Sequence, residues 1–123
     1  MMTDVKAVIG RHLTAIGKRD LTAYSATLRD EVEVILPNGS RLSGRRGVED
    51  FHREFFADTE WTQDVTELSL RVTGGTAVAV YEADYRGSAE GRPVRKRFLL
   101  TLVFVDDGSG WALLHDQCTP LPD

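Results

Sequence analysis

The sequence predicts an α+β fold, in which a curved antiparallel sheet carries three N-terminal helices on one face and forms a cone with an internal pocket. Two patterns predict this fold. Apolar residues recur at helical spacing through much of the first half of the chain, and after Trp61 they alternate at strand spacing. Short turns containing glycine separate the later segments, which indicates antiparallel neighbours.

Three helices are expected in the first half of the chain. The first begins near Thr3, a suitable N-cap, and its apolar stripe comprises Val5, Val8, Ile9, His12, Leu13 and Ile16. Asp20 can cap a second, short helix, whose buried side would carry Leu21, Tyr24 and Leu28. The third helix follows Gly44, and its wide apolar face comprises Val48, Phe51, His52, Phe55 and Phe56.

Strands are expected where apolar residues alternate, at 32–36, 68–72, 76–86, 94–105 and 111–118. The last two have apolar residues at both parities, as in Leu99 beside Leu100, so both faces of the sheet should be covered. A second subunit would supply the missing cover, which predicts a homodimer through the sheet.

Length and composition are those of a small globular protein. The 123 residues are 41% hydrophobic and 28% charged, and neither a linker nor a repeat divides them, so one domain spanning 1–123 is expected. Fifteen Lys and Arg residues against nineteen Asp and Glu residues give a net charge of −4. This charge repels polyanions and argues against nucleic acid as a partner.

The first residues turn polar at once, and the chain has no apolar run long enough for a secretory signal or a membrane span. The single cysteine, Cys118, cannot form an intrachain disulfide. We therefore expect a cytoplasmic protein with no membrane partner.

All three histidines of the chain fall at apolar-face positions by the local period. These are His12, His52 and His115, and Gln117 follows His115 on the same face of the last strand. If their elements converge, the histidines bracket one cavity, where an imidazole could accept or donate a proton. The alternative for each is a core histidine hydrogen-bonded to a carbonyl group.

The expected strand at 76–86 supplies candidate carboxylates. Glu82 and Asp84 share one face with Val78 and Val80, and this face is expected to line the cavity. Either carboxylate would then act as a base or orient a histidine; the alternative is that both are solvent-facing charges. On the other face, packing or dimer contacts are expected for Tyr81 and Tyr85.

No signature of a metal site or a cofactor site is present. HExxH spacing, a phosphate loop and a dinucleotide fingerprint are all missing, so we expect neither a metal ion nor an organic cofactor. A facial triad of histidine and carboxylate ligands stays open as an alternative. Arg97, expected beside the sheet interior, is a candidate to hold a substrate carboxylate.

Several short motifs follow one another in an order that covers nearly the whole chain. They are Arg19-Asp20-Leu21, Leu36-Pro37-Asn38-Gly39, Gly44-Arg45, Val48 with Phe51-His52, and the closing segment 110–120. This arrangement resembles the nuclear transport factor 2-like superfamily, in particular its SnoaL-like and ketosteroid-isomerase-like members. The resemblance implies a dimer and a cone that holds a small ligand, and it leaves the reaction open because the superfamily includes enzymes and non-catalytic association domains.

The resemblance also implies positions for pocket residues. His12 and His52 fall where a ketosteroid isomerase has pocket tyrosines, and His115 and Gln117 fall on pocket-lining positions of the last strand. Leu36 replaces the isomerase's catalytic aspartate before the proline, and its second acid is replaced by Leu100, Thr101 or Leu102. Steroid isomerisation by that mechanism is therefore not expected.

The leading hypothesis is a cofactor-independent acid/base enzyme of isomerase, cyclase or hydrolase type, acting on a small, largely apolar carbonyl substrate. Its candidate catalytic residues are His12, His52, His115 and Asp84. The candidate ligand-binding residues are Tyr24, Leu28, Leu36, Val78, Val80, Glu82, Thr101 and Gln117. The alternative hypothesis is a non-catalytic ligand-binding or dimerisation module, which the loss of both isomerase carboxylates favours.

Overall fold

The computed structural model describes residues 2–122. Its helices α1 (Met2–Gly17), α2 (Leu21–Ser25) and α3 (Gly44–Ala57) lie where the apolar periodicity predicts them. Asp20 caps α2, because its carboxylate accepts the amide hydrogen of Ala23 at 3.1 Å. Within the described residues, no helix has the length and apolar character needed to cross a membrane.

The second helix ends earlier than predicted, so Leu28 belongs to strand β1 (Leu28–Ile35) instead. Thr27 accounts for the difference. Its hydroxyl donates to the carbonyl of Tyr24 at 2.7 Å, and its own carbonyl accepts the amide hydrogen of Leu113 at 2.7 Å. The backbone at residue 27 is therefore already paired with the last strand and cannot continue a helix.

The remaining strands are β2 (Arg41–Ser43), β3 (Thr62–Thr73), β4 (Thr76–Ala89), β5 (Arg92–Asp106) and β6 (Trp111–Pro120). The six strands form one sheet in the order β2-β1-β6-β5-β4-β3. The pairing is antiparallel except between β1 and β6, which run parallel, so the sheet is mixed. The alternation of apolar residues along each strand cannot predict this parallel pairing, because β1 and β6 lie far apart in the sequence.

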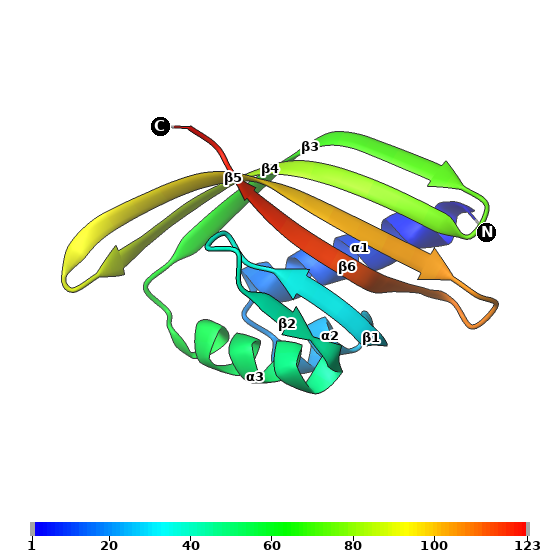
Figure 1. Ribbon diagram of the computed structural model, residues 1–123, viewed down its shortest axis with the longest axis horizontal. Helices are drawn as coiled ribbons and strands as arrows, with labels where there is room; N and C mark the ends of the chain where they lie inside the picture. The colour runs from blue at the N-terminus through cyan, green and yellow to red at the C-terminus, as the bar shows by residue number, and fades with distance from the viewer. Residues whose placement is uncertain (1, 123) are drawn as a thin grey trace.

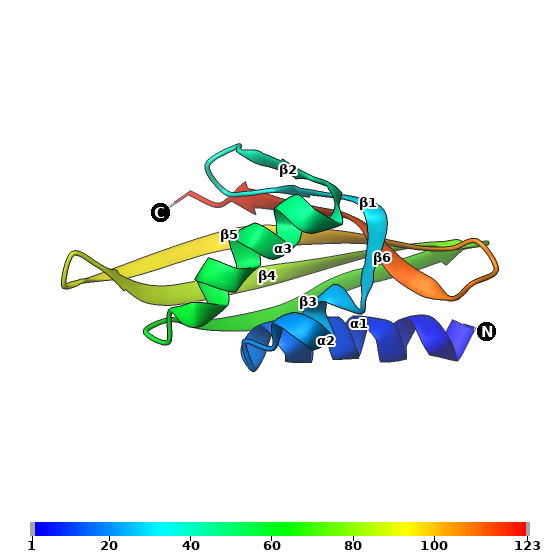
Figure 2. The ribbon, with the colours of Figure 1, turned by 90° about the horizontal axis from the view of Figure 1, so that it is seen from below.

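The sheet is long and arched, and the helices lie on one of its faces (Figures 1 and 2). The inner face carries the core residues Ala77, Ala79, Tyr81 and Ala83 of β4 and Phe98, Leu100, Leu102 and Phe104 of β5. Figure 2 shows α3 and α1 lying against this face. None of the helices of residues 2–122 lies on the opposite face.

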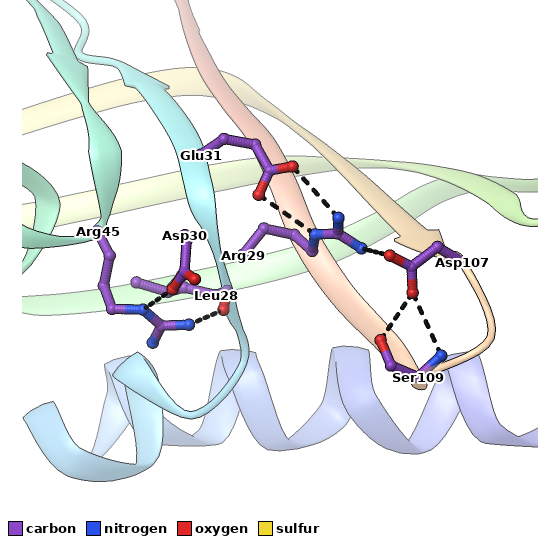
Figure 3. A network of polar contacts seen from close by, with 7 residues as sticks. All are labelled: Leu28, Arg29, Asp30, Glu31, Arg45, Asp107 and Ser109. Atoms are coloured by element: carbon purple, nitrogen blue, oxygen red, sulfur yellow. Dashed lines mark hydrogen bonds and ion pairs between the residues drawn. The ribbon is translucent and has the colours of Figure 1, made fainter.

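An exposed polar network holds β1 in place beside β6 (Figure 3). Arg29 on β1 pairs with Glu31 at 3.2 Å and with Asp107, in the loop between β5 and β6, at 2.9 Å. Ser109 lies in the same loop, and its hydroxyl donates a hydrogen bond to the Asp107 carboxylate at 2.7 Å. Each such pair contributes little by itself, but together they connect the loop before β6 to the strand that runs parallel to it.

Candidate functional site

A cavity of about 230 Å³ lies between α3, the end of α1 and the inner face of the sheet. Its lining is mainly apolar and includes three phenylalanine rings, those of Phe51, Phe55 and Phe98. The polar side chains that line it are His52, Gln63, Tyr85, Lys96, Asp116 and Cys118. A wider surface depression of about 600 Å³ between α1 and α2 has no buried titratable side chain in its lining. The 230 Å³ cavity is therefore the candidate site.

Asp116 is the buried carboxyl group of this cavity. Its side chain is only 6% exposed, and Cys118 Sγ, at 4.0 Å from Oδ1, makes its one hydrogen bond among the described residues. Burial disfavours the charged form and raises the pKa of Asp116 to about 7. Near neutral pH this carboxyl group can both accept and donate a proton, which is the requirement for general acid/base chemistry.

A β-bulge brings Asp116 to the inner face. Leu113 pairs with Phe104, whereas His115 pairs with the adjacent Val103, so Leu114 is an extra residue between them. One extra residue exchanges the two faces of the strand beyond it. Leu113 and Asp116 both lie inward in consequence, an arrangement that strict alternation does not predict.

His115 and Gln117 therefore lie on the outer face, and the prediction that they line the cavity is wrong. His115 pairs in register with Glu33 of β1, and its Nδ1 lies 3.5 Å from the Glu33 carboxylate. Its Nε2 lies 3.3 Å from the amide oxygen of Gln117. These contacts form a small polar cluster across the parallel strands.

His52 lines the cavity, as predicted, from the buried side of α3. Its Nδ1 lies 2.8 Å from the carbonyl oxygen of Val48, one turn earlier. A carbonyl can only accept, so Nδ1 carries the hydrogen and Nε2 presents a lone pair. Burial lowers the pKa of His52 to about 4, so the ring is neutral at neutral pH and can accept a hydrogen bond.

His12 is a core residue that does not line the cavity. Its Nδ1 lies 2.8 Å from Thr27 Oγ1, whose own hydrogen goes to the Tyr24 carbonyl, so His12 is the donor. Burial, together with the charge of His52, lowers the pKa of His12 to about 3. Only Tyr24 connects the two histidines by ring contact, with centroids 5.0 Å from His12 and 4.3 Å from His52.

The structure thus does not bring the three histidines to one cavity. His52 lines it, His12 lies behind Tyr24, and His115 lies on the other side of the sheet. Among the described residues, His12 Nε2 and the Tyr24 hydroxyl are buried without a hydrogen-bond partner. These two groups make the core beside the cavity unusually polar.

The prediction that the Val78 face of β4 lines the cavity is wrong. Val78, Val80, Glu82 and Asp84 lie on the outer face, because Ala77, Ala79, Tyr81 and Ala83 are the residues packed beneath the helices. Both faces of this strand are apolar over 77–81, so alternation alone does not decide which one is buried. Packing decides it, and the alanines leave room for the helices.

Asp84 is an outer-face charge, not a cavity base. Arg95 donates to both of its carboxylate oxygens, at 3.0 and 2.9 Å. This hydrogen bonding, with Arg86 nearby, lowers the pKa of Asp84 to about 2. Glu82 is likewise 3.2 Å from Arg97, so Arg97 also lies outside the cavity, contrary to expectation.

The other predicted ligand residues divide between the cavity and its surroundings. Leu36 lines the cavity. Tyr24 and Leu28 are core residues, and Thr101 lies on the outer face opposite Val80. Tyr85, predicted to make packing or dimer contacts, lines the cavity instead.

The polar site residues that sequence reasoning missed are Cys118, Asp116, Tyr85, Lys96 and Gln63. The last three form one row across the inner face, since Gln63 pairs with Tyr85 and Tyr85 pairs with Lys96. A sequence signal exists for Asp116, because it is the acidic residue of β6 and follows the apolar run 111–114 after one intervening residue. Within residues 2–122, no three His, Cys, Asp or Glu side chains are grouped so as to hold a metal ion.

Solved structures with the same fold have low sequence identity to this chain. A protein with a cystatin-like fold from Caulobacter vibrioides has 21% identity and a TM-score of 0.84, covering 98% of this chain and 89% of its own. A ketosteroid isomerase-like protein from Erwinia carotovora atroseptica has 13% identity and a TM-score of 0.81, and the match covers 98% of this chain and 96% of that protein. The CaMKII hub of S. rosetta has 22% identity and a TM-score of 0.76, covering 97% and 95%.

Likeness at this level of identity establishes the fold alone. No curated protein matches the chain. A family model described as the SnoaL-like domain matches residues 5–121, which is nearly the whole sequence and includes every residue of the cavity. The chain belongs to the SnoaL-like domain family.

Proposed function

We propose that this protein binds a small, largely apolar carbonyl compound in the cavity and that Asp116 moves a proton on it. The observation that carries the proposal is a buried carboxyl group in an apolar cavity, with its pKa raised to about 7. A general acid/base works best when its pKa lies near the working pH. Family membership supports small-molecule chemistry without specifying the reaction.

In the proposed reaction, the carboxylate form of Asp116 removes a proton next to the substrate carbonyl. In a substrate with a β,γ double bond, the resulting carboxylic acid returns the proton to the γ-carbon of the dienolate, which completes an isomerisation. In a substrate with a second carbonyl group, the enolate carbon attacks that group, the new C–C bond closes a ring, and the carboxylic acid gives its proton to the alkoxide so formed. Cys118, whose thiol is kept protonated because burial raises its pKa, can donate weakly beside Asp116. His52 would accept a hydrogen bond from a substrate hydroxyl through Nε2 and so orient it.

This proposal moves the acid/base role from the predicted histidines to Asp116. A histidine with a pKa of about 4 binds a proton too weakly to retain it at neutral pH. Asp116 is also the buried carboxyl group in contact with the cavity. His52 is then a positioning residue.

The test is hydrogen–deuterium exchange of the acidic CH₂ group of 2-tetralone, a two-ring ketone, followed by proton NMR. The wild-type protein should accelerate exchange, and Asp116→Asn should reduce the acceleration by about 10²-fold or more. Asp84→Asn removes a carboxylate from the outer face and should leave the rate unchanged. Equal rates for the wild type and Asp116→Asn would refute the role of Asp116.

A second candidate is a ligand-binding or dimerisation module without turnover. It is favoured by the loss of both isomerase carboxylates, since the resemblance places one at Leu36 and the other at Leu100, Thr101 or Leu102. In that case 2-tetralone would bind without faster exchange. For either function we propose a homodimer through the outer face of the sheet, where Val78, Val80, Leu99 and Val103 lie partly exposed.

A further inference from the structure

The basic residues at the start of β5 are not equivalent. Arg95 and Arg97 lie on the outer face and are paired with Asp84 and Glu82 of β4. Lys96 lies between them in sequence and therefore on the inner face, where it lines the cavity. Among the described residues, Lys96 has no ion pair, in contrast to the two arginines beside it.

Lys96 stands at the solvent end of the cavity and Asp116 at its buried end. Lys96 is exposed, whereas Asp116 is buried and pairs in register with Leu102. Six residues separate Lys96 from Leu102 on β5, which along an extended strand is about 20 Å between Cα atoms. A ligand that contacts both groups is therefore elongated, and a ligand of two fused rings held at Lys96 reaches toward Asp116 only because the long lysine side chain itself spans part of this distance.

The lining between these two ends is suited to flat rings. Phe55 stacks on Trp61 with an interplanar angle of 3° and a centroid separation of 4.3 Å. Tyr85 lies nearly parallel to Phe55, at 27° and 6.5 Å. The two rings that face the cavity thus lie roughly parallel to each other beside Lys96, where a planar ligand can lie against them.

The volume limits the size of the ligand. An apolar cavity of about 150 Å³ holds one benzene ring, and the volume of about 230 Å³ here is about one and a half times as large. This space encloses about two fused rings and does not enclose a four-ring compound. The polar end of a two-ring ligand would then reach the row formed by Gln63, Tyr85 and Lys96.

We infer that the ligand is a flat acid of one or two rings, whose carboxylate pairs with Lys96 while its apolar body extends between the aromatic side chains toward Asp116. This inference rests on the proposed function and specifies its substrate class. Lys96 would act in binding and specificity, since its ammonium group supplies the positive charge that a carboxylate at the cavity mouth requires.

The test compares two probes of the same shape, 2-naphthoate and the uncharged 2-naphthamide, by chemical-shift titration of isotope-labelled protein at pH 6. At this pH an ordinary carboxyl group is ionised, and Asp116, with its pKa of about 7, is mostly uncharged. We expect naphthoate to bind the wild type about fivefold to tenfold more tightly than naphthamide, as for a charged hydrogen bond at a partly exposed site.

Lys96→Met should abolish this preference and leave the affinity for naphthamide unchanged, while Lys96→Arg should retain the preference. Arg97→Met is the matched control, because it removes the same charge from the outer face one residue away. Equal binding of the two probes by the wild type, a preference that persists in Lys96→Met, or no binding of either probe would each overturn the inference. Tetralone exchange is measured separately, so loss of the acid preference is distinguishable from failure of Asp116 as the base.

Discussion

At the scale of single residues, burial assigns different chemical states to groups that look interchangeable in the sequence. Asp116 and Asp84 are both strand aspartates, yet burial raises the pKa of the first to about 7, while hydrogen bonding to Arg95 lowers that of the second to about 2. His52 and His12 are both neutral at neutral pH because burial lowers their pKa values to about 4 and about 3. The proton-carrying group of the cavity is therefore the aspartate.

The raised pKa of Asp116 has a measurable consequence for stability. Between the ordinary aspartate value of 3.8 and about 7, the folded protein holds a proton that the unfolded chain has lost, so the free energy of unfolding falls as pH rises. Asp116→Asn removes this dependence. Relative to the wild type, the variant should gain stability across this pH window, by roughly 4 kcal/mol in all.

Urea unfolding of both proteins from pH 4 to pH 8 checks this expectation. His12 and His52 act in the opposite sense, since their lowered pKa values make stability rise with pH up to the ordinary histidine value of 6.5. They are present in both proteins, so their contribution largely cancels in the difference. Parallel stability curves for the wild type and Asp116→Asn would contradict the raised pKa.

At the scale of elements, the apolar surface of helix α3 serves two purposes. Part of it packs in the core, and an adjacent part lines the cavity. Val48, His52 and Phe56 are buried against the rest of the molecule, whereas Phe51 is half-buried and lines the cavity. Phe56 contacts the rings of both Tyr24 and His52, with centroids 5.6 and 5.5 Å away. The buried side of the helix therefore supports the fold and contributes His52 to the cavity, while Phe51 borders the cavity from the margin of that side.

These two positions should respond differently to truncation. Phe56→Ala removes a closely packed ring and leaves a void, so we expect it to lower the free energy of unfolding by about 3 kcal/mol or more. Phe51→Ala, whose ring already borders empty space, should cost about 1 kcal/mol and enlarge the cavity. Urea unfolding measures both, and equal losses would show that the Phe51 ring is as tightly packed as that of Phe56.

Strand β6 shows how one residue changes the chemistry of an element. The extra residue Leu114 places Asp116 on the cavity face and His115 on the outer face. A regular strand would place them the other way round. The bulge therefore decides whether the cavity contains a carboxyl group or an imidazole at this end.

At the scale of the whole molecule, all three helices that the structure describes lie on one face of the sheet and leave its other face bare (Figures 1 and 2). The bare face combines partly exposed valines and leucines with ion pairs such as Arg95–Asp84 and Arg97–Glu82. An apolar centre with a charged periphery is the usual organisation of a protein interface. It supports the proposed dimer, in which each copy supplies the cover that the other lacks.

The proposed dimer can be tested at Val103, which pairs in register with Val78 on this face. Val103→Glu places a charge at the centre of the proposed interface, so the protein should change from two chains to one. Light scattering after gel filtration measures this directly. Arg53→Glu, on the exposed side of α3, is the control and should leave the mass unchanged; a wild-type protein of one chain would rule the dimer out.

The sequence by itself determined the order and kind of the elements except the short strand β2, which was not predicted, because helical and strand periods are local properties of neighbouring residues. It also indicated the family through short motifs, and it identified His52 and Leu36 as cavity residues. The tertiary structure alone decided the parallel pairing of β1 with β6 and the buried face of β4, where 77–81 is apolar on both sides. It also placed Asp116 and Lys96 at opposite ends of one cavity, since a bulge and the pairing of distant strands set which side chains meet.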